Sequence, residues 1–369
     1  MGKSSVLPGP LTRARRHLRL SILAQGIGPM RTPPFITLFV NSICNLTCDH
    51  CFYWQSLNQR DDLTFAELEV LSQDLGRIEN INLSGGEPFI RKDLAEVVTM
   101  FVKNNGVKQV YVPTSGFFPD RLERVVRQVM ADCPELQIFA LELSLDGTAA
   151  YHDRIRGHAE SFDRAMQSYD VAAALQQQDP RIRVHATSVS TSENLEELRL
   201  LSHFLFDRCP RMDHHHVASI RGDRKDPGLV EPRADLHQSL WVEVQRLWAP
   251  REEGRFGGLV EPLLQWARVQ TLQHKRQVIP CKAGLLSGVV HANGDVGLCE
   301  QHPPVGNLRE HGFRTIWGSE RAQALRARIA ARECWCTNEA YMWPSVTYHP
   351  PSFARAVVGS GAWRPQRDR

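Results

Sequence analysis

The feature that most constrains the fold is a regular alternation of apolar strand-like runs and amphipathic helical stretches between residues 35 and 220. The strand-like runs cover residues 35–40, 80–83, 109–112, 138–145, 181–189 and 214–220. Apolar residues recur at three- and four-residue spacing over residues 65–75, 92–104, 120–130, 162–177 and 194–206. Six strands that alternate with five helices predict a parallel sheet with right-handed crossovers.

The segment directly after the first strand-like run indicates the kind of parallel sheet, because it has no glycine-rich dinucleotide-binding fingerprint. We therefore expect an α/β chain whose main part is an open or partial (β/α)6 barrel of the TIM type, not a doubly wound sheet. In β/α barrels the active site lies at the carboxyl ends of the strands. Functional residues are therefore expected at those ends.

Composition divides the remainder of the 369-residue chain. Residues 1–33 are expected to be a partly disordered leader with a short basic helix over residues 11–25. Residues 34–222 are assigned to the barrel, and residues 223–280 to a charged linker followed by a helical pair (236–248 and 259–276). Residues 281–343 are assigned to a small auxiliary cluster domain with a β-hairpin, whose signal is the Asn293 and Gly294 turn between two apolar runs. Residues 344–369, rich in proline and arginine, are expected to be a fraying tail.

The charge balance and hydropathy exclude several classes of protein. Lysine and arginine total 44 against 41 acidic residues, a net charge of +3, whereas a dedicated nucleic-acid binder carries a basic stripe. No window approaches 18 uninterrupted apolar residues, and the N-terminal apolar run is too short for a signal peptide. We expect a cytoplasmic protein with no membrane span and no nucleic-acid partner.

Seven of the nine cysteines fall in two groups. In a long chain without a secretion signal, grouped cysteines favour metal ligands over a disulfide scaffold. The first group, Cys44, Cys48 and Cys51, directly follows the first strand, and three thiolates in a short loop can converge on one centre. Zinc would require a fourth ligand such as the adjacent His50. An iron–sulfur cluster on three cysteines would leave one iron open to a non-protein ligand.

The spacing Cys-x3-Cys-x2-Cys after the first strand of a β/α barrel resembles that of the radical S-adenosylmethionine (radical SAM) enzymes. The resemblance implies a [4Fe–4S] cluster on Cys44, Cys48 and Cys51 whose open iron binds S-adenosylmethionine (SAM). It implies reductive cleavage of SAM to a 5′-deoxyadenosyl radical, which abstracts hydrogen from a substrate. It also implies that His50 lies near the adenine of SAM.

The resemblance extends to other strand ends. The family has a Gly-Gly-Glu motif after its second strand that binds the amino group of SAM, and Ser84, Gly85, Gly86 and Glu87 stand there in this chain. The glycines allow a close backbone approach, and the carboxylate pairs with an ammonium. Further residues expected to contact SAM are Thr114, Ser115, Ser144, Arg156, Ser190 and Asn194. An exposed salt bridge is the alternative role for Arg156, and helix capping that for Asn194.

The sixth strand-like run contains three consecutive histidines and is followed by Arg221. Strand residues alternate in the face that they present, so at most two of the three histidines point into the barrel together. We expect one or two of the candidates His214, His216 and Arg221 to face the substrate, and no catalytic residue is assigned. Metal binding by the histidines is the less favoured interpretation.

The second group consists of Cys281, Cys299, Cys334 and Cys336. Four cysteines suffice for one closed site, and by ligand count zinc and iron–sulfur fit equally. The spacing and the hairpin resemble the SPASM/twitch domains of radical SAM enzymes, which implies one auxiliary [4Fe–4S] cluster. One residue separates Cys334 from Cys336 where the family commonly has two, so full ligation of that cluster is left open. Cys133 and Cys209 are expected to be buried thiols. The less favoured alternative makes one of them a hydrogen-atom donor, as radical epimerases require.

The resemblances together imply a radical SAM enzyme of oxidoreductase type, with the auxiliary cluster as electron acceptor. A small-molecule or sugar-like substrate is favoured, oxidised at an alcohol of a sugar or aminocyclitol, because only 34 residues precede the first strand and many peptide-modifying relatives carry a longer leader-binding domain. Crosslinking or epimerisation of a ribosomal peptide is the alternative. The expected reductant is an external flavodoxin or ferredoxin. The competing class is a non-enzymatic zinc protein that binds a partner.

Overall fold

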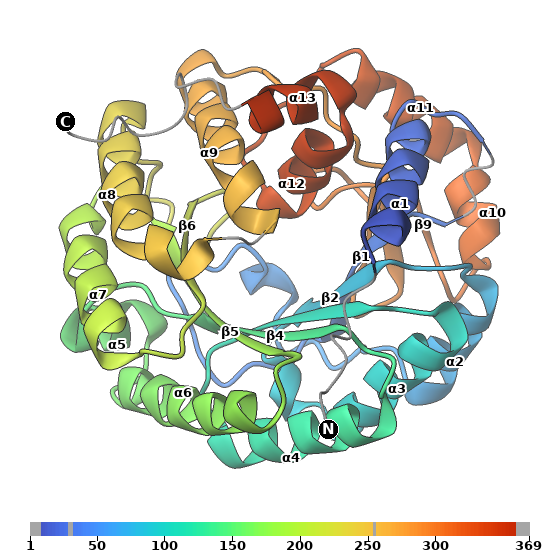
Figure 1. Ribbon diagram of the computed structural model, residues 1–369. Helices are drawn as coiled ribbons and strands as arrows, with labels where there is room; N and C mark the ends of the chain where they lie inside the picture. The colour runs from blue at the N-terminus through green and yellow to red at the C-terminus, as the bar shows by residue number, and fades with distance from the viewer. Residues whose placement is uncertain (1–8, 29–31, 254–255, 359–369) are drawn as a thin grey trace.

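The computed structural model describes residues 9–28, 32–253 and 256–358, and its centre is one nine-stranded sheet (Figure 1). The strand order is β6-β5-β4-β3-β2-β1-β7-β8-β9. The strands are β1 (Phe35–Asn41), β2 (Asn80–Gly85), β3 (Gln109–Thr114), β4 (Ile138–Ser144), β5 (Ile182–Ser190), β6 (His214–Ser219), β7 (Ser287–Val290), β8 (Asp295–Gly297) and β9 (Gly306–Asn307). Strands β1 to β7 are joined in parallel pairs, whereas β8 and β9 are added antiparallel.

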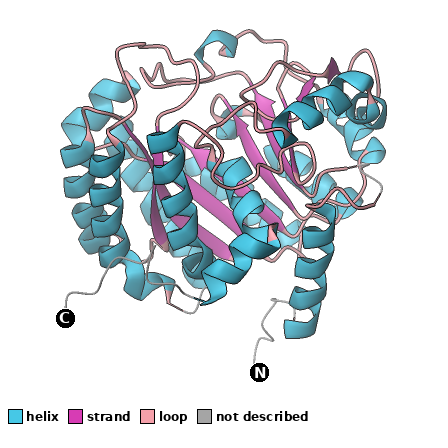
Figure 2. Cartoon of the chain, turned by 90° about the horizontal axis from the view of Figure 1, so that it is seen from above, coloured by secondary structure: helices cyan, strands magenta, loops and turns pink. Residues whose placement is uncertain are grey.

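Helices surround this sheet, and Figure 2 shows them on its flanks with loops gathered along one edge. The helices of the barrel are α2 (Phe65–Asp74), α3 (Leu94–Asn105), α4 (Pro119–Asp132), α5 (Ala149–Arg156), α6 (Ser161–Gln178) and α7 (Leu195–Arg208). The other helices are α1 (Pro10–Leu23), α8 (Ala234–Glu252), α9 (Phe256–His274), α10 (Phe313–Gly318), α11 (Glu320–Ala330), α12 (Glu339–Tyr348) and α13 (Pro350–Val358). Short 3-10 turns occupy η1 (Trp54–Ser56) and η2 (Pro88–Ile90). Among the described residues no helix is both long and apolar enough to cross a membrane.

The partial barrel predicted from the sequence is confirmed. All six predicted strands and all five predicted crossover helices are present, and α5 is an additional helix between β4 and α6. Alternation explains the strands: in β5 buried and partly exposed residues alternate along the whole strand. Local signals explain the helix starts, for example the capping box in which Thr64 and Glu67 each accept the other's backbone N–H at the start of α2.

The predicted hairpin is present but lies in the barrel sheet. Strand β7 pairs in parallel with β1, with Phe35 opposite Ser287, so the segment that contains the second cysteine group extends the main sheet at its β1 edge. A hairpin signal specifies which two strands pair with each other, but not which third strand they join. The division into domains at residues 222, 280 and 343 stays a prediction.

The two ends of the chain are more ordered than expected over their described parts. Helix α1, in the segment assigned to a leader, docks through an ion pair between Arg16 and Glu79 at 2.7 Å and through buried Leu20 against Phe35. Helices α12 and α13 occupy the segment expected to fray, up to Val358. Residues 1–8 of the leader and residues 359–369 of the tail lie outside the described part of the chain.

The C-terminal helices α9, α12 and α13 fill the side of the barrel that the sheet leaves open beyond its β6 edge (Figure 1). Helix α8 packs on β6, α9 packs on α8, α12 and α13, and α12 also contacts β7. The apolar part of this seal joins Val260, Leu263 and Leu264 of α9 to Val346 of α12, all fully buried. Segments far apart in the sequence therefore close one wall.

The polar part of the same seal is a group of charged side chains around β6. His214 bonds Glu252 of α8, and His216 bonds Glu339 of α12. Glu261 of α9 lies 3.9 Å from His216. The fully buried Arg268 of α9 lies 3.3 Å from Glu339. Burial would lower the pKa of His214, but the hydrogen bond to Glu252 and the charges of Glu252, Glu261 and Glu339 raise it to about 9. The carboxylates therefore keep His214 protonated at neutral pH.

This arrangement predicts a pH-dependent stability. The folded pKa of His214 lies above its unfolded value of roughly 6.5, so its contribution, on the order of 3 kcal/mol, is fully present below pH 6.5 and is lost as the pH rises through 9. The variant that tests this is His214→Gln, which removes the titrating ring and keeps the nearby His185, His216 and Arg268 in the sequence. Anaerobic denaturant unfolding should show a large difference in free energy between wild type and variant at pH 6 and a small one at pH 10.

The matched control is His203→Gln, which removes an exposed histidine that lies 3.4 Å from Glu243 on the protein surface. Its effect on the unfolding free energy should be small at both pH values, because surface pairs contribute little. A His214→Gln deficit that is the same at pH 6 and pH 10 would contradict the assignment of a charged His214.

Candidate functional site

The loop that carries the first cysteine group is fixed to the end of β2 by its backbone. Gly86 N–H donates to the carbonyl of Asn41 at 3.0 Å, and Glu87 N–H donates to that of Ile43 at 2.8 Å. A Cβ on Gly85 would lie 2.2 Å from the carbonyl oxygen of Asn41, and a Cβ on Gly86 would lie 2.2 Å from that of Ile43. Gly85 also has a φ of +138°. Only glycine fits both positions. The two glycines thus allow the β2 end and the cysteine loop to touch, a role the sequence did not reveal.

The other side of the cysteine loop is held by the end of α5 and by the segment after β6. Thr47 N–H donates to the carbonyl of Arg156 at 3.3 Å, and Asp49 N–H donates to that of Ile155 at 3.0 Å. Asp226 N–H in turn donates to the carbonyl of Asp49 at 2.8 Å. The loop between Cys44 and Cys51 is therefore tied down on both sides by main-chain bonds, which fixes where its side chains can meet.

The three thiols of this loop form a buried donor set. Cys48 is buried, and Cys44 and Cys51 are partly buried; all three are free of disulfides. Burial raises the pKa of Cys44 to about 12 and that of Cys51 to about 11, and the charge of Cys48 contributes to both shifts. Thiols whose pKa is raised by burial become thiolates when a bound cation compensates their charge. The donor set therefore fits a thiolate-ligated cluster.

Asp146 organises the polar side of the same site, although sequence reasoning did not single it out. Its buried carboxylate accepts from Arg156 Nε at 2.8 Å and from Val189 N–H at 2.8 Å, and it lies 3.6 Å from His50 Nε2. Burial would raise the pKa of Asp146, but Arg156 and His50 hold it at about 2. Its place two residues after Ser144, at a strand end, is the signal that could have found it.

Arg156 connects this carboxylate to the cysteines. Its Nη1 lies 3.7 Å from Cys48 Sγ, and its Nη2 lies 2.5 Å from Asp146. The salt bridge is thus buried, not exposed as the alternative interpretation had it. His50, predicted to lie near adenine, is close to the same carboxylate, and burial lowers its pKa.

Glu87 is held by residues that were predicted to bind the cofactor. It is buried, and its carboxylate accepts from Thr114 Oγ1 at 2.7 Å and from Ser115 N–H and Oγ at 2.8 and 2.7 Å. Phe89 N–H adds a bond at 3.2 Å. Thr114 and Ser115 therefore orient the Glu87 carboxylate.

The remaining predicted cofactor contacts lie at strand ends in two kinds of environment. Ser190 and Asn194 are buried and bond protein groups: Ser190 Oγ donates to Ala218 carbonyl at 3.1 Å, and Asn194 Nδ2 donates to Val189 carbonyl at 2.9 Å. Asn194 occupies the N-cap position of α7 without a side-chain capping bond. Ser84 of β2 and Ser144 of β4 are partly exposed at the ends of their strands. They are the members of the predicted set best placed to meet a ligand.

The residues predicted to face a substrate separate into two places. His214 and His216 bond acidic residues of α8 and α12 in the polar part of the seal. Donor atoms of His214, His216 and Glu261 lie within 4.8 Å of one another, as a metal site requires. However, Arg268 Nη2 lies 3.5 Å from His216 Nε2, and its charge opposes a bound cation. The structure therefore gives these histidines salt-bridge partners.

Arg221 lies between the two cysteine groups. Its guanidinium is 4.7 Å from the ring centroid of Phe52, the residue after Cys51, and its Nη2 donates to Glu300, the residue after Cys299, at 3.1 Å. Asn338 Nδ2, two residues after Cys336, donates to the same Glu300 oxygen at 3.0 Å. One side chain thus connects the loop of the first cysteine group to that of the second.

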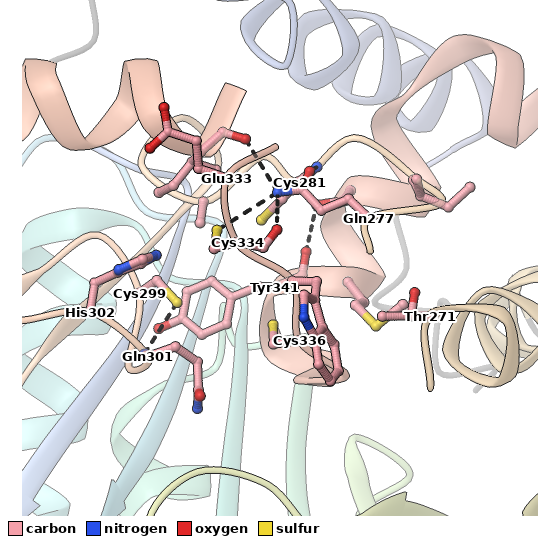
Figure 3. A pocket seen from close by; sticks show the side chains of 16 residues that line it. Thr271, Gln277, Cys281, Cys299, Gln301, His302, Glu333, Cys334, Cys336 and Tyr341 are labelled. Carbon is pink, nitrogen blue, oxygen red and sulfur yellow. Dashed lines mark hydrogen bonds between the residues drawn. The ribbon is translucent and has the colours of Figure 1, made fainter. Parts of the chain in front are cut away.

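The second cysteine group lines a cavity of about 280 Å³ (Figure 3). All four thiols of this group border it, together with Gln277 and Tyr341. Gln277 Oε1 accepts from Cys281 N–H at 3.0 Å, and its Nε2 donates to the Cys334 carbonyl at 2.9 Å. Burial raises the pKa of Cys281 to about 12 and raises that of Cys299 as well. The cavity and the four thiols that border it fit a thiolate-ligated cluster.

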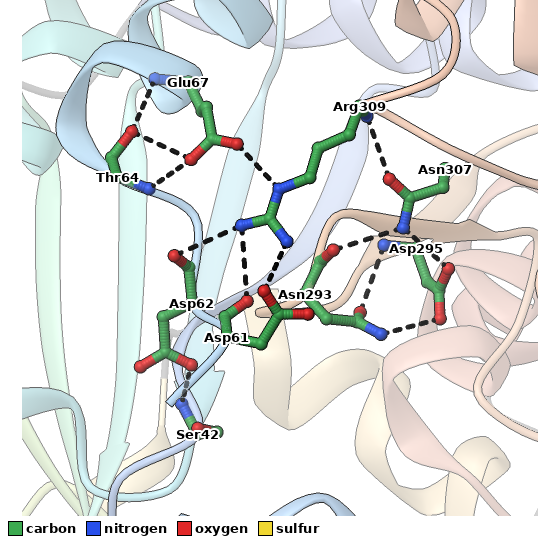
Figure 4. Close-up of polar contacts among 9 residues, drawn as sticks. All are labelled: Ser42, Asp61, Asp62, Thr64, Glu67, Asn293, Asp295, Asn307 and Arg309. Carbon is green, nitrogen blue, oxygen red and sulfur yellow. Dashed lines mark hydrogen bonds and ion pairs between the residues drawn. The ribbon is translucent and has the colours of Figure 1, made fainter. Parts of the chain in front are cut away.

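A polar cluster holds the two cysteine-bearing segments together from outside (Figure 4). Arg309 Nε donates to Glu67 at 2.7 Å, and its Nη1 donates to Asp61 at 2.5 Å. On the hairpin side, Asn307 Nδ2 donates to Asp295 at 3.0 Å and to the Asn293 carbonyl at 3.1 Å. The loop after the first cysteine group and the hairpin of the second are therefore fixed relative to each other.

Comparison with known proteins gives the family. Residues 38–205 match the family model of the radical SAM superfamily, and residues 281–338 match that of the iron–sulfur cluster-binding domain SPASM. The chain belongs to the radical SAM superfamily and carries a C-terminal SPASM domain. These two domains imply SAM, a radical SAM [4Fe–4S] cluster and an auxiliary iron–sulfur cluster as cofactors.

Relatives are similar over most of the chain. The Fe-coproporphyrin III synthase of Methanosarcina barkeri is 26% identical over 309 residues, which are 77% of this chain and 73% of the relative. The mycofactocin maturase MftC of Mycobacterium tuberculosis is 27% identical over 321 residues, 82% of this chain and 75% of the relative. Among solved structures, Streptococcus suis SuiB bound to SAM has a TM-score of 0.57 at 17% identity, covering 86% of this chain and 72% of SuiB. The structure of anSMEcpe with bound SAM has a TM-score of 0.58 at 14% identity, covering 88% of this chain and 98% of that chain.

The close contact at Gly86 predicts what happens when one methyl group is added at this position. In Gly86→Ala the new Cβ collides with the carbonyl of Ile43, so the cysteine loop must move and its cluster should be lost. Iron and acid-labile sulfide analysis after anaerobic reconstitution should fall from about eight irons to about four per chain.

Gly318→Ala is the matched control, because a Cβ there meets nothing within 4 Å. It should retain the full iron content. A Gly86→Ala protein with wild-type iron and wild-type electron paramagnetic resonance (EPR) signals would show that the backbone contact does not position the ligands.

Proposed function

We propose that the chain is a radical SAM enzyme in which two clusters serve one substrate. In this proposal Cys44, Cys48 and Cys51 hold the cluster that cleaves SAM. The auxiliary cluster is held by Cys281, Cys299, Cys334 and Cys336. The observation that carries the proposal is the Arg221 bridge, because it joins the residue after Cys51 to the residue after Cys299. A substrate at this mouth would meet both cluster sites.

The chemistry of the bound groups is that of the family. When bound, a [4Fe–4S] cluster with an open iron supplies the electron that splits SAM into methionine and a 5′-deoxyadenosyl radical, which takes a hydrogen atom from the substrate, and an auxiliary cluster accepts the further electron released when the substrate radical also loses a proton. We propose that a flavodoxin or ferredoxin supplies the first electron.

The chain's own residues would bind, orient and exclude water in this reaction. Ser84 and Ser144 stand partly exposed at the strand ends where SAM is proposed to lie, with the Glu87 carboxylate oriented by Thr114 and Ser115. His50 has a lowered pKa and is therefore a neutral ring at neutral pH, suited to pack against adenine. These contacts support cofactor roles for the predicted residues.

We propose a peptide as the substrate. SuiB, which shares this fold, has been solved with its precursor peptide SuiA, at a TM-score of 0.56. Likewise, anSMEcpe has been solved with the Cp18Cys peptide, at a TM-score of 0.57. The relative that matches 82% of the chain is named a maturase. Oxidation of a sugar or aminocyclitol alcohol stays a prediction that the same substrate assay tests.

The first experiment tests cleavage of SAM. Anaerobic incubation of the reconstituted chain with SAM and dithionite should release 5′-deoxyadenosine, and Cys44→Ala should abolish it because a cluster ligand is lost. Cys209→Ala is the control, since Cys209 is a fully buried thiol packed in the core and should leave cleavage intact. Formation of 5′-deoxyadenosine by Cys44→Ala would refute the assignment of the first cysteine group.

The second experiment tests the substrate and the auxiliary site. Mass spectrometry of a short peptide encoded beside the gene should show a loss of hydrogen for oxidation or crosslinking, or solvent deuterium incorporation for epimerisation. Cys299→Ala should still form 5′-deoxyadenosine yet leave the peptide unmodified, because the electron acceptor is disrupted. Full peptide modification by Cys299→Ala would contradict the auxiliary role. Turnover of an aminocyclitol with no change in the peptide would replace the proposed substrate class.

A further inference from the structure

Tyr341 carries a buried hydroxyl that the described residues leave without a hydrogen-bond partner. The side chain lies in α12 and is 1% exposed, and its hydroxyl oxygen is fully shielded. Burying a hydroxyl without a partner costs about 1–3 kcal/mol. A native core keeps such a group where something that the protein chain does not supply completes its bonding.

The position of Tyr341 indicates the nature of that partner. The residue lines the cavity of the second cysteine group, and Figure 3 shows its hydroxyl end directed toward Cys299 and Gln301. A tyrosine hydroxyl carries one O–H group that can donate a hydrogen bond. Because the hydroxyl has no partner among the described residues, its proton is free to be donated to a group that enters the cavity.

The ring is held firmly in this place. Asn338, the N-cap of α12, accepts from Ala340 N–H at 3.1 Å and donates to Glu300 at 3.0 Å. One turn further along α12, Ser345 donates to the Tyr341 carbonyl and accepts from Lys282 N–H at 2.9 Å. These bonds attach the helix to the residues that come directly after Cys281 and Cys299, so the tyrosine cannot turn away from the cavity.

We infer that Tyr341 donates a hydrogen bond to a sulfide of the auxiliary cluster when that cluster is bound, and thereby raises the reduction potential of the cluster. The inference rests on the proposed ligand assignment. Gln301 N–H already donates to Cys299 Sγ at 3.3 Å, so the cluster and its ligands would receive two donors on this side. Hydrogen bonds to cluster sulfurs stabilise the reduced, more negative state. Tyr341 is in this sense a positioning residue that favours transfer of the substrate electron.

The test is a potentiometric titration of the auxiliary cluster, monitored by EPR under anaerobic conditions. A background with Cys44→Ala, Cys48→Ala and Cys51→Ala leaves the auxiliary cluster as the only signal. Tyr341→Phe keeps the ring and removes the donor, so the midpoint potential should shift to a more negative value. Tyr341→3-fluorotyrosine has a more acidic hydroxyl and should shift the potential in the opposite direction.

Tyr348→Phe is the matched control, because Tyr348 is a buried tyrosine of the same helix that packs against Leu20 and Phe35 away from the cavity. It should leave the potential unchanged. An unchanged potential in both Tyr341 variants, or an equal shift in Tyr348→Phe, overturns the inference. If the background protein binds zinc and gives no iron signal, the proposed auxiliary cluster is refuted. Failure of the proposed cluster can therefore be distinguished from failure of the Tyr341 inference.

Discussion

The contact on which the rest of the site depends is the backbone pairing between the end of β2 and the start of the cysteine loop. Two main-chain bonds, from Gly86 to Asn41 and from Glu87 to Ile43, bring these segments too close for any Cβ. Because β1 and β2 are adjacent parallel strands, the loops that leave their carboxyl ends must meet. The Gly-Gly-Glu motif therefore positions the cysteine loop, in addition to any contact that it makes with a cofactor.

The electrostatics of the site depend on this placement. The loop sets Cys48 against Arg156, and Arg156 is held in turn by the buried Asp146. A buried ion pair costs desolvation that its attraction barely offsets, so such a pair is better explained by position than by stability. Here it keeps a fixed positive charge beside thiols that a cluster requires as thiolates. The carboxylate also fixes Arg156 through Nε and Nη2, which leaves Nη1 directed at the sulfur.

The sequence could predict the elements whose signals are local and periodic. Alternation in β5 and the Cys44, Cys48 and Cys51 spacing are readable without a structure. The features that remained hidden depend on partners distant in sequence: Glu339 reaches His216 across more than a hundred residues. The segment expected to be a fraying tail is rich in proline, yet Pro350 begins α13. Proline is favoured at the first position of a helix because an N–H group there makes no hydrogen bond within the helix. Asp146 was missed because a carboxylate at a strand end has many possible roles until Arg156 and His50 are seen around it.

Arg221 shows how the sheet brings two distant cysteine groups to one mouth. It follows β6, at one end of the parallel order, whereas β7 and the second group extend the β1 edge. The curvature of the partial barrel and its closure by α9 and α12 bring these edges together, so that one guanidinium reaches Phe52 and Glu300. Glu300 also accepts a hydrogen bond from Asn338, which follows Cys336. A displacement of either cysteine loop must therefore strain the contacts that hold the other. The helices that follow β6, which the sequence predicts as a helical pair without indicating what they pack against, thereby close the wall between the two sites.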